Sequence, residues 1–351
     1  MITSKVSAFP RVSIVIPTRD RPKELVDLLQ TVFNQSHSPL EVTIVDDSPV
    51  GSGKQVVDSL GSKFASINCT LRHVKGTGDG LPAARNLGAN ISKGDTVLFL
   101  DDDTLLDRNT LRALATFLRD NPFVMGVQPK IVPQTTENLK IAGFTEKFEN
   151  AFYKVLMLNY QVENKLSVRR SGANVFPNSL TRVIPAQRLS GCCCCYRREI
   201  FTKFRFDTNL KRWGFMEDLD LSYRVYRKNP NSFYATPHAK VIHKRSATAR
   251  LPRKMDIHMT TIYWSYVFFK DVFEGSILNL IAFLWALVGN VVTVVGWLVI
   301  RNKPKREWWA LIYLLSSYAV ALRNLENIKL GRLDFFNKKL NGRKSCKNVK
   351  S

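Results

Sequence analysis

Short apolar runs alternate with amphipathic stretches along the first 110 residues of this 351-residue chain. Four runs have the length and β-branched content of buried strands: 12–17, 41–45, 71–74 and 96–100. Between some of these runs lie stretches with apolar residues at helical spacing, such as 24–33 and 81–91. This alternation predicts βαβ units and a parallel, doubly wound, Rossmann-like sheet, which is an α/β fold.

Acidic residues stand directly after the fourth strand-like run. Asp101, Asp102 and Asp103 follow the apolar segment 96–100, and three adjacent carboxylates repel one another unless a cation or solvent compensates them. Ligands of doubly wound sheets bind beyond the carboxyl ends of the strands. A divalent ion that also holds phosphate oxygens suits this position. The alternative is a solvated acidic turn, and the buried strand in front of the run favours the functional interpretation.

Two further strand ends carry candidate binding residues. Asp47, in the pair that follows 41–45, offers a carboxylate to the base or ribose of a nucleotide, as the acidic residue of dinucleotide folds does. An Asx turn is the alternative for that pair. Pro17, Thr18 and Arg19 end the first run, and Arg19 could meet a phosphate or a base or remain a surface residue. Arg85, in the helical stretch 81–91, is near enough in sequence to reach the same crevice.

A second acidic pair occurs in the segment WGFMEDLDLSYR. Glu217 and Asp218 stand beside aromatic residues, and partial burial of a carboxylate raises its pKa toward that of a general base. The alternative is an acidic first turn of the following helix. His243 ends a predicted strand over 239–243 and could complete a metal site with Asp103, although a lone histidine is more often structural.

The remaining apolar and polar patterns describe the rest of the chain. Residues 123–185 are irregular and polar, which predicts loops, short strands and a flap. The four consecutive cysteines 192–195 lack the paired C-x-x-C spacing of zinc sites, so we expect reduced, buried side chains in a strand. Residues 263–273 are rich in aromatic side chains, which is typical of a segment at a membrane interface.

The stretch 277–300 holds 24 residues without a charge, which is long enough to cross a bilayer. Residues 308–322 are also uncharged, but this stretch is short for a span, and a re-entrant or interfacial helix fits it as well. The positive-inside rule places both the basic loop 301–306 and the basic stretch after residue 323 on the cytoplasmic side. A simple hairpin with a cytoplasmic catalytic domain does not satisfy both, so the number and orientation of the spans stay open.

Charge adds one constraint on the partners. Lys and Arg outnumber Asp and Glu by 52 to 29, a net charge of +23, which favours anionic partners such as nucleic acid, phosphate-bearing substrates or an anionic membrane. Much of the excess lies near the apolar segments and at the carboxyl end, and the sequence holds no nucleic-acid reader motif. We therefore expect phosphate-bearing substrates and a membrane, and no nucleic acid.

The ordered set of these motifs resembles a known family. The segments VSIVIPTRDRPKELVDLLQTVFNQ, VDDS and LPAARNLGANISKGDTVLFLDDDT resemble the nucleotide-binding half of inverting family-two glycosyltransferases, which have the GT-A fold. The segments LSGCCCCYRREIF and WGFMEDLDLSYRVYR resemble their acceptor half. The resemblance covers residues 10–250. The Gln-x-x-Arg-Trp signature of processive members is absent from the sequence, which favours the transfer of single sugars.

The resemblance implies roles at the donor site. Asp47 would contact the nucleoside, and Pro17, Thr18 and Arg19 would line its pocket. Arg85 would assist there or at the phosphates.

The resemblance also implies a metal site and a base. Asp101 and Asp103 match the Asp-x-Asp element that holds Mn²⁺ or Mg²⁺ on the diphosphate, with Asp102 near the ribose. His243 lies in a segment that resembles one whose histidine completes the metal shell in some members of the family. Asp218 matches the base that deprotonates the acceptor hydroxyl for inverting attack, and Glu217 would help to position the acceptor.

These expectations define a domain organisation. A GT-A domain over 1–250 has a nucleotide-binding half (1–110) and an acceptor half (111–250). An interfacial linker (251–275), membrane segments (276–323) and a basic tail (324–351) follow it. We expect a membrane enzyme whose catalytic domain faces the cytoplasm and whose acceptor is lipid-linked, such as a polyprenyl or dolichyl phosphate, or another glycan. The alternative function is a non-catalytic membrane scaffold that binds a nucleotide sugar.

Overall fold

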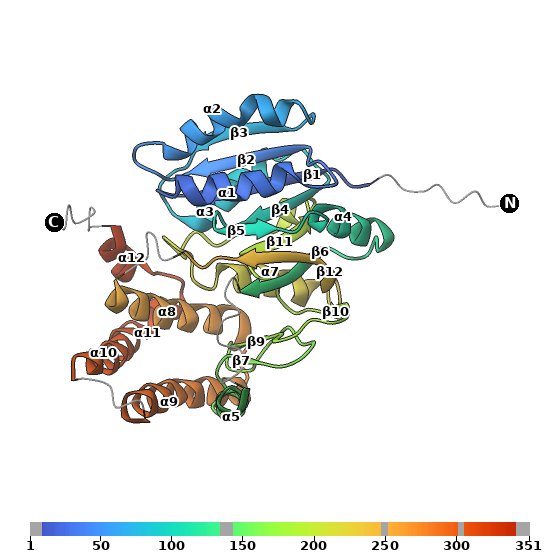
Figure 1. Cartoon of the computed structure of the whole chain (residues 1–351). Helices are drawn as coiled ribbons and strands as arrows, with labels where there is room; N and C mark the ends of the chain where they lie inside the picture. The colour runs from blue at the N-terminus through green and yellow to red at the C-terminus, as the bar shows by residue number, and fades with distance from the viewer. Residues whose placement is uncertain (1–8, 134–142, 247–251, 301–304, 342–351) are drawn as a thin grey trace.

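The apolar runs of the amino-terminal half form one large sheet. The computed structural model describes residues 9–133, 143–246, 252–300 and 305–341, and these residues include a nine-stranded mixed sheet. Figure 1 shows this sheet with helices against it, and the carboxyl-terminal helices, drawn in orange and red, packed beside one end. The strand order is β10-β12-β6-β11-β4-β1-β2-β3, with β5 paired to β12.

The first four strands confirm the predicted βαβ pattern. Their order is β3-β2-β1-β4 and all three pairings are parallel. On β1, Ile14 and Ile16 face one apolar core while Val15 faces the other, so both faces of the strand are buried. The elements are β1 (Val12–Thr18), α1 (Pro22–Phe33), β2 (Glu41–Asp46), α2 (Ser52–Ala65), β3 (Thr70–Lys75), α3 (Leu81–Ile91) and β4 (Thr96–Leu100). Parallel strands that are buried on both faces explain the continuous apolar runs.

The second half of the sheet is mixed, whereas the prediction of parallel strands concerned the first 110 residues. Strand β11 runs antiparallel to both β4 and β6, while β12 is parallel to β6 and antiparallel to β5 and β10. The elements are β5 (Thr104–Leu106), α4 (Thr110–Asp120), β6 (Gly126–Pro133), β10 (Ile184–Pro185), β11 (Cys193–Arg197), α6 (Ile200–Lys203), α7 (Glu217–Lys228) and β12 (Phe233–His243). The chain enters β11 after a long excursion instead of a helical crossover, so β11 can run in the opposite direction.

The cysteine run lies where the sequence predicts. Cys193 and Cys195 face one core and Cys194 faces the other, and all three thiols are buried and free. Burial raises the pKa of Cys195 to about 12. These thiols are therefore protonated and pack as small apolar side chains. Cys346 lies outside the described residues.

The region 123–185 contains more regular structure than the polar pattern indicates. Besides β6 it holds the helix α5 (Gly143–Val155) and a three-stranded sheet of β7 (Tyr160–Gln161), β8 (Ser167–Val168) and β9 (Asn174–Phe176). The short strands confirm one part of the prediction, and the helix corrects another. Helix α5 exposes Phe148, Phe152 and Val155. A helix is predicted from apolar residues on a buried face, and these apolar residues are exposed, so the pattern did not reveal the helix.

The carboxyl-terminal helices form a third apolar core. They are α8 (Arg253–Val267) with a π-helical turn (Phe268–Val272), α9 (Ile277–Ile300), a 3₁₀ turn (Lys305–Trp308), α10 (Trp309–Arg323), α11 (Leu325–Lys329) and α12 (Asp334–Asn341). Tyr263 and Phe268 are fully buried in this core, which corrects the expectation of an interfacial aromatic segment. Phe336 is buried there as well, so the described part of the basic tail folds back onto the core.

Helix α9 is the one helix of the described residues that is long and apolar enough to cross a membrane, and only 22% of its most apolar window is buried. Ile281, Leu284 and Val288 are half exposed on its outer surface, while Phe283 and Ala286 pack into the third core. Helix α10 is apolar but shorter. The apolar outer surface of α9 therefore has no protein partner among the described residues.

Candidate active site

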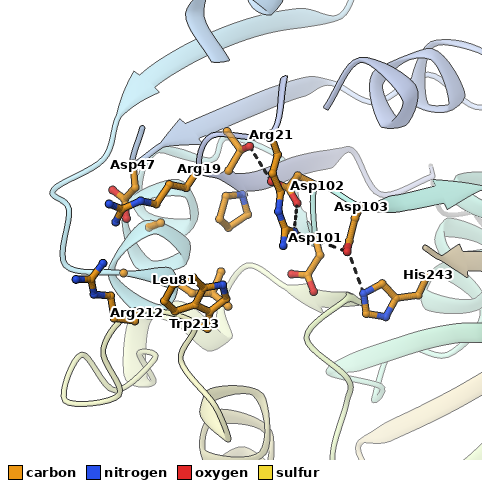
Figure 2. Close-up of a pocket in the computed structure, with 14 residues that line it drawn as sticks. Arg19, Arg21, Asp47, Leu81, Asp101, Asp102, Asp103, Arg212, Trp213 and His243 are labelled. Carbon is orange, nitrogen blue, oxygen red and sulfur yellow. Dashed lines mark hydrogen bonds and ion pairs between the residues drawn. The ribbon is translucent and has the colours of Figure 1, made fainter. Parts of the chain in front are cut away.

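The carboxyl ends of β1, β2 and β4 open into a cleft of about 250 Å³. Nearly all of the acidic and basic candidates from the strand ends line it, as Figure 2 shows. Residues that the sequence singles out in this lining are Pro17, Thr18, Arg19, Asp47, Asp101, Asp102, Asp103 and His243. The cleft lies where a doubly wound sheet binds its ligands.

At one end of the cleft, the adjacent residues Asp46 and Asp47 have different surroundings. Asp46 is buried, and its carboxylate accepts hydrogen bonds from the backbone N–H groups of Ser48 and Gly53, both at 2.8 Å. Asp47 lines the cleft, where its Oδ1 accepts a hydrogen bond of 2.9 Å from the N–H of Gly78. Asp46 thus stabilises the loop, and Asp47 faces the position of a ligand.

The glycine-rich loop 76–80 closes this end of the cleft. A Cβ at position 76 would lie 2.0 Å from Oδ1 of Asp47, so a side chain there would displace that carboxylate. Gly80 has φ +100° and pairs with the backbone of Arg212, and a side chain there would collide with that backbone. The loop thereby brings Arg212 and Trp213, which are distant in sequence, into the lining.

Asp102 is bound within the site. Its carboxylate accepts hydrogen bonds from the hydroxyl of Thr18 at 2.8 Å and from Nη1 of Arg21 at 2.9 Å. Burial raises the pKa of Asp102 to about 6, although Arg21 and Thr18 act in the opposite direction. These two partners hold the carboxylate of Asp102 in place inside the site.

Asp101, Asp103 and His243 come together at the other end of the cleft. Each offers one ligand atom, and the three atoms lie within 4.8 Å of one another. Nε2 of His243 is 3.2 Å from Oδ1 of Asp103, whose Oδ2 accepts a hydrogen bond from the N–H of Ser246. Two carboxylate oxygens and one imidazole nitrogen fit a divalent cation such as Mn²⁺, with positions left for phosphate oxygens.

The pKa values of His243, Asp103 and Asp101 are set by burial and by the contacts of these residues with one another and with their neighbours. Burial acts to lower the pKa of His243, but the hydrogen bonds to Asp103 and Cys192 and the nearby negative charges together outweigh it and raise the value to about 10. Burial likewise acts to raise the pKa of Asp103, but the hydrogen bonds from His243 and Ser246 and the nearby positive charges together outweigh it and lower the value. Burial raises the pKa of Asp101 despite the opposing effects of Arg85 and His243. A proton on His243 thus occupies the place that a cation would take.

Arg85 connects this group to the second acidic pair. Its Nη2 donates to Oδ1 of Asp101 at 2.9 Å and to the carbonyl of Gly191 at 2.8 Å, and its Nη1 donates to Oε1 of Glu217. The side chain is fully buried and does not line the cleft. The structure therefore places Arg85 behind the acidic residues and away from the expected donor pocket.

Glu217 and Asp218 begin helix α7 and lie outside the lining of the cleft. Burial raises the pKa of Glu217 to about 8, with Arg85 acting in the opposite direction. Asp218 accepts hydrogen bonds at Oδ2 from the side chain of Arg188 and, at 2.8 Å, from the N–H of Gly191. Both carboxylates are thus oriented by arginines that come from other parts of the chain.

Four site residues have no place in the expectations from sequence: Arg21, Arg188, Arg212 and Trp213. Arg21 and Trp213 lie inside quoted segments, so their position beside a strand end and near the Glu-Asp pair was a usable signal. Arg188 and Arg212 reach the site through tertiary contacts alone.

This half-parallel sheet, with an acidic turn after β4 and a cleft at the strand ends, is a GT-A fold. The sequence profile described as "Glycosyl transferase family 2" matches residues 13–205, more than half of the chain. The chain therefore belongs to glycosyl transferase family 2.

Two curated relatives show the range of the sequence similarity. A glucosyl-dolichyl phosphate glucuronosyltransferase of Haloferax volcanii is 23% identical over 244 residues, which cover 67% of this chain and 69% of that protein. An uncharacterized glycosyltransferase of Rickettsia bellii is 30% identical over 114 residues, which cover 32% of this chain. The match spans only 16% of the Rickettsia protein.

Solved structures share the fold. The mannosyltransferase PcManGT of Pyrobaculum calidifontis, in complex with GDP-Man and Mn²⁺, has a TM-score of 0.55 at 18% identity, covering 90% of this chain and 87% of that one. TarS residues 1–349 of S. aureus has a TM-score of 0.51 at 16% identity, covering 95% and 92%. At these identities the likeness establishes the fold alone.

Proposed function

We propose that this protein is a membrane-bound enzyme that transfers a single sugar from a nucleotide-diphospho-sugar to the hydroxyl of a lipid-linked acceptor. The reaction inverts the anomeric carbon and depends on a divalent metal. The observation that carries this proposal is the arrangement of one cleft, with Asp47 at one end and the group of Asp101, Asp103 and His243 at the other. A nucleoside and a metal-bound diphosphate need these two kinds of partner at the two ends of one site.

The donor end of the proposal rests on the strand ends. Asp47 accepts hydrogen bonds from the nucleoside, and Pro17, Thr18 and Arg19 line the same end of the cleft. Asp102, fixed by Thr18 and Arg21, lies next to the metal ligands and faces the ribose. The Pyrobaculum mannosyltransferase binds GDP-Man.

The metal end uses Asp101, Asp103 and His243 as ligands, and the imidazole among them favours Mn²⁺ over Mg²⁺. When bound, a divalent cation neutralises charge on the diphosphate of the donor. Arg85 holds Asp101 in place through its hydrogen bond and ties this ligand to Glu217 on the acceptor side. We therefore assign Arg85 a positioning role in place of donor contact.

On the acceptor side, we assign the proton transfer to Asp218. Its carboxylate removes the proton of the acceptor hydroxyl, whose oxygen attacks the anomeric carbon as the bond to the nucleoside diphosphate breaks. Arg188 and the N–H of Gly191 hold one oxygen of this carboxylate and so fix its direction. Glu217, with a pKa of about 8, positions the acceptor.

The membrane part of the proposal rests on the exposed apolar surface of α9. A lipid-linked acceptor agrees with the name of the Haloferax relative, which acts on a glucosyl-dolichyl phosphate. A GT-A domain over 1–250, with carboxyl-terminal membrane segments, remains our proposed division of the chain. The cytoplasmic orientation of the catalytic domain remains a prediction.

Donor hydrolysis in the absence of acceptor tests the proposal against the non-catalytic scaffold. The full chain, purified in detergent, is incubated with UDP- and GDP-sugars and Mn²⁺, and the release of nucleoside diphosphate is measured. We expect release with one donor, and its loss with EDTA or in the Asp103→Ala variant. Binding of a nucleotide sugar without release, with or without a lipid extract as acceptor, would favour the scaffold.

A further inference from the structure

A second cavity lies between the acceptor half and the membrane-facing helices. Its volume is about 230 Å³, below the roughly 300–1,000 Å³ of pockets for drug-sized ligands, so it suits a small group. Tyr153 of α5, Trp264 of α8, and Asn290 and Thr293 of α9 contribute to its walls. The cavity is therefore built jointly by the catalytic domain and by the helix that is apolar enough to enter a membrane.

Two polar atoms at this cavity lack a partner. The indole nitrogen of Trp264 and the hydroxyl of Thr293 are both buried, and neither has a hydrogen-bond partner among the described residues. A threonine inside a helix commonly donates to a carbonyl three or four residues earlier, which Thr293 does not do. A buried donor without an acceptor costs stability. Both groups line the same cavity, so one ligand with hydroxyl oxygens would satisfy them together.

The character of the wall selects the ligand. Among the described residues, none in the lining is an acid or a basic residue, so the cavity has no group to pair with a phosphate. Aromatic rings of Phe215 and Trp264 offer flat apolar faces, and Asn159 and Asn290 offer amides. Aromatic faces combined with neutral donors and acceptors match an uncharged sugar ring, which has apolar faces and a rim of hydroxyls. A hydrocarbon chain would leave Trp264 and Thr293 unsatisfied.

Residues that line the cavity lie close in sequence to Asp218, the proposed base. The loop that carries Arg212 and Trp213 to the donor cleft continues with Phe215 and Met216 into the wall of this cavity, and Asp218 follows two residues later. A sugar held here would lie on the acceptor side of that loop.

Helix α5, which contributes Tyr153 to the cavity, has exposed apolar side chains. Helix α5 exposes Phe148 and Phe152, and its last residue, Val155, accepts a hydrogen bond of 2.9 Å from the indole of Trp285 on α9. Figure 1 shows the two helices next to each other at one end of the molecule. A bilayer that covers the exposed side chains of α5 and α9 would bring a lipid-anchored sugar to the edge of the cavity.

We propose that this cavity binds the uncharged sugar headgroup of a membrane-anchored glycolipid acceptor. The inference rests on the proposed glycosyltransferase function, and it narrows the acceptor from any lipid-linked hydroxyl to a lipid that already carries a neutral sugar.

Binding of hexyl glycosides to the full chain in lipid nanodiscs tests this proposal. The probes are the hexyl glycosides of glucose, galactose, mannose and N-acetylglucosamine, measured by ligand-observed NMR against empty nanodiscs. We expect at least one to bind, more tightly than the methyl glycoside of the same sugar, and without competition from hexyl phosphate. No binding by any hexyl glycoside would overturn the proposal. Displacement of the bound glycoside by hexyl phosphate at similar concentrations would overturn it as well. Equal binding of the methyl glycoside would contradict the membrane anchor.

Matched variants locate the binding. Thr293→Val keeps the shape of the side chain and removes the hydroxyl, and it should weaken the hexyl glycoside about tenfold. Thr293→Ser keeps the hydroxyl and should stay within about threefold of the wild type. Equal affinity in all three proteins would place the glycoside elsewhere and overturn the proposal. Thermal unfolding of both variants serves as the control for folding.

The donor reaction separates this inference from the function on which it rests. Both variants at Thr293 should retain wild-type, Mn²⁺-dependent hydrolysis of the donor, because this residue does not line the donor cleft. Donor hydrolysis without glycoside binding would overturn the acceptor proposal alone. Glycoside binding without donor hydrolysis would overturn the proposed enzyme function and leave the sugar site.

Discussion

Nη2 of Arg85 lies 2.9 Å from Oδ1 of Asp101, and this bond joins the acidic turn after β4 to the interior of the protein. The other nitrogen of the same guanidinium binds Glu217 at the start of α7. One buried arginine thus holds a proposed metal ligand and an acceptor-side carboxylate in a fixed relation. The two halves of the site, about 115 residues apart in sequence, share this single cation.

We expect Arg85→Met to destabilise the protein by about 3–5 kcal/mol, because it leaves two carboxylates without their buried partner. Arg85→Lys keeps the charge but cannot form both bonds in the geometry of a planar fork, so it should fold and lose most of its activity. Chemical unfolding and a transfer assay measure the two effects. Wild-type activity in Arg85→Lys would show that the two hydrogen bonds of Arg85, to Asp101 and to Glu217, have no positioning role.

Asp218→Asn should keep donor affinity and reduce transfer by about 10²–10⁴-fold, the usual contribution of a general base. This substitution preserves the volume of the side chain and removes its capacity to accept a proton. Asp58→Asn is the matched control, because Asp58 is an exposed residue of α2 paired with Lys54. Steady-state transfer and nucleotide binding are measured in parallel. Substantial transfer by Asp218→Asn would move the base to another residue, with Glu217→Gln as the next variant.

The raised pKa of Glu217 predicts a pH dependence of stability. Its value is about 8 in the folded protein against a reference of 4.5, mainly because of burial. The folded state therefore binds the proton more tightly, and the stabilisation present below pH 4.5 is lost as the pH rises through 8. Each unit of pKa difference corresponds to about 1.4 kcal/mol.

Glu217→Gln isolates this effect, since the other titrating groups are common to both proteins. The melting temperature of the wild type relative to Glu217→Gln should fall between pH 5 and pH 9. A constant or rising difference over this range would show that Arg85 keeps Glu217 ionised at all these values.

The exposed surface of α9 predicts membrane attachment. Leu284 and Val288 are about half exposed, at 52% and 50%, and Lys at either position would place a charge in the proposed membrane contact. A charge at the centre of a membrane helix costs about 2.5–3.5 kcal/mol on insertion scales. We expect the Leu284→Lys, Val288→Lys double variant to move to the soluble fraction on carbonate extraction. The control is Val50→Lys, at an 81% exposed position on the sheet domain, and equal retention of both proteins would contradict the attachment.

The strand ends could be predicted from sequence because local pattern determines them. A continuous apolar run is a strand buried on both faces, and parallel strands bring their carboxyl ends to one edge, so Asp47 and the run Asp101 to Asp103 had to converge. His243 joins them because β12 pairs with β6 and β5, a long-range pairing that periodicity does not reveal. The sequence offered His243 as a possible ligand at the end of a predicted strand, and the resemblance to a family strengthened that hypothesis.

The parts that escaped prediction depend on tertiary contacts. Arg188 binds Asp218 across 30 residues, and the backbone of Arg212 pairs with Gly80 across more than 130. Helix α5 was missed because its apolar residues Phe148 and Phe152 are exposed and stand in a polar stretch, so they do not mark a buried helix face. The aromatic residues near Tyr263 were expected at a membrane surface, yet the helices that follow cover them. Composition alone cannot distinguish a lipid-facing aromatic from a buried one.

The most direct test of the account is the thermal stability of the purified full chain with nucleoside diphosphates, in Mn²⁺ and then in EDTA. We predict that one nucleotide raises the melting temperature only with Mn²⁺. Asp103→Ala should abolish this increase. His243→Ala should weaken nucleotide-dependent Mn²⁺ binding by at least about tenfold, since loss of even an outer partner of a metal site costs 10–100-fold. An increase that survives EDTA and the Asp103→Ala substitution, or no increase with any nucleotide, would contradict a metal-dependent donor site in this cleft.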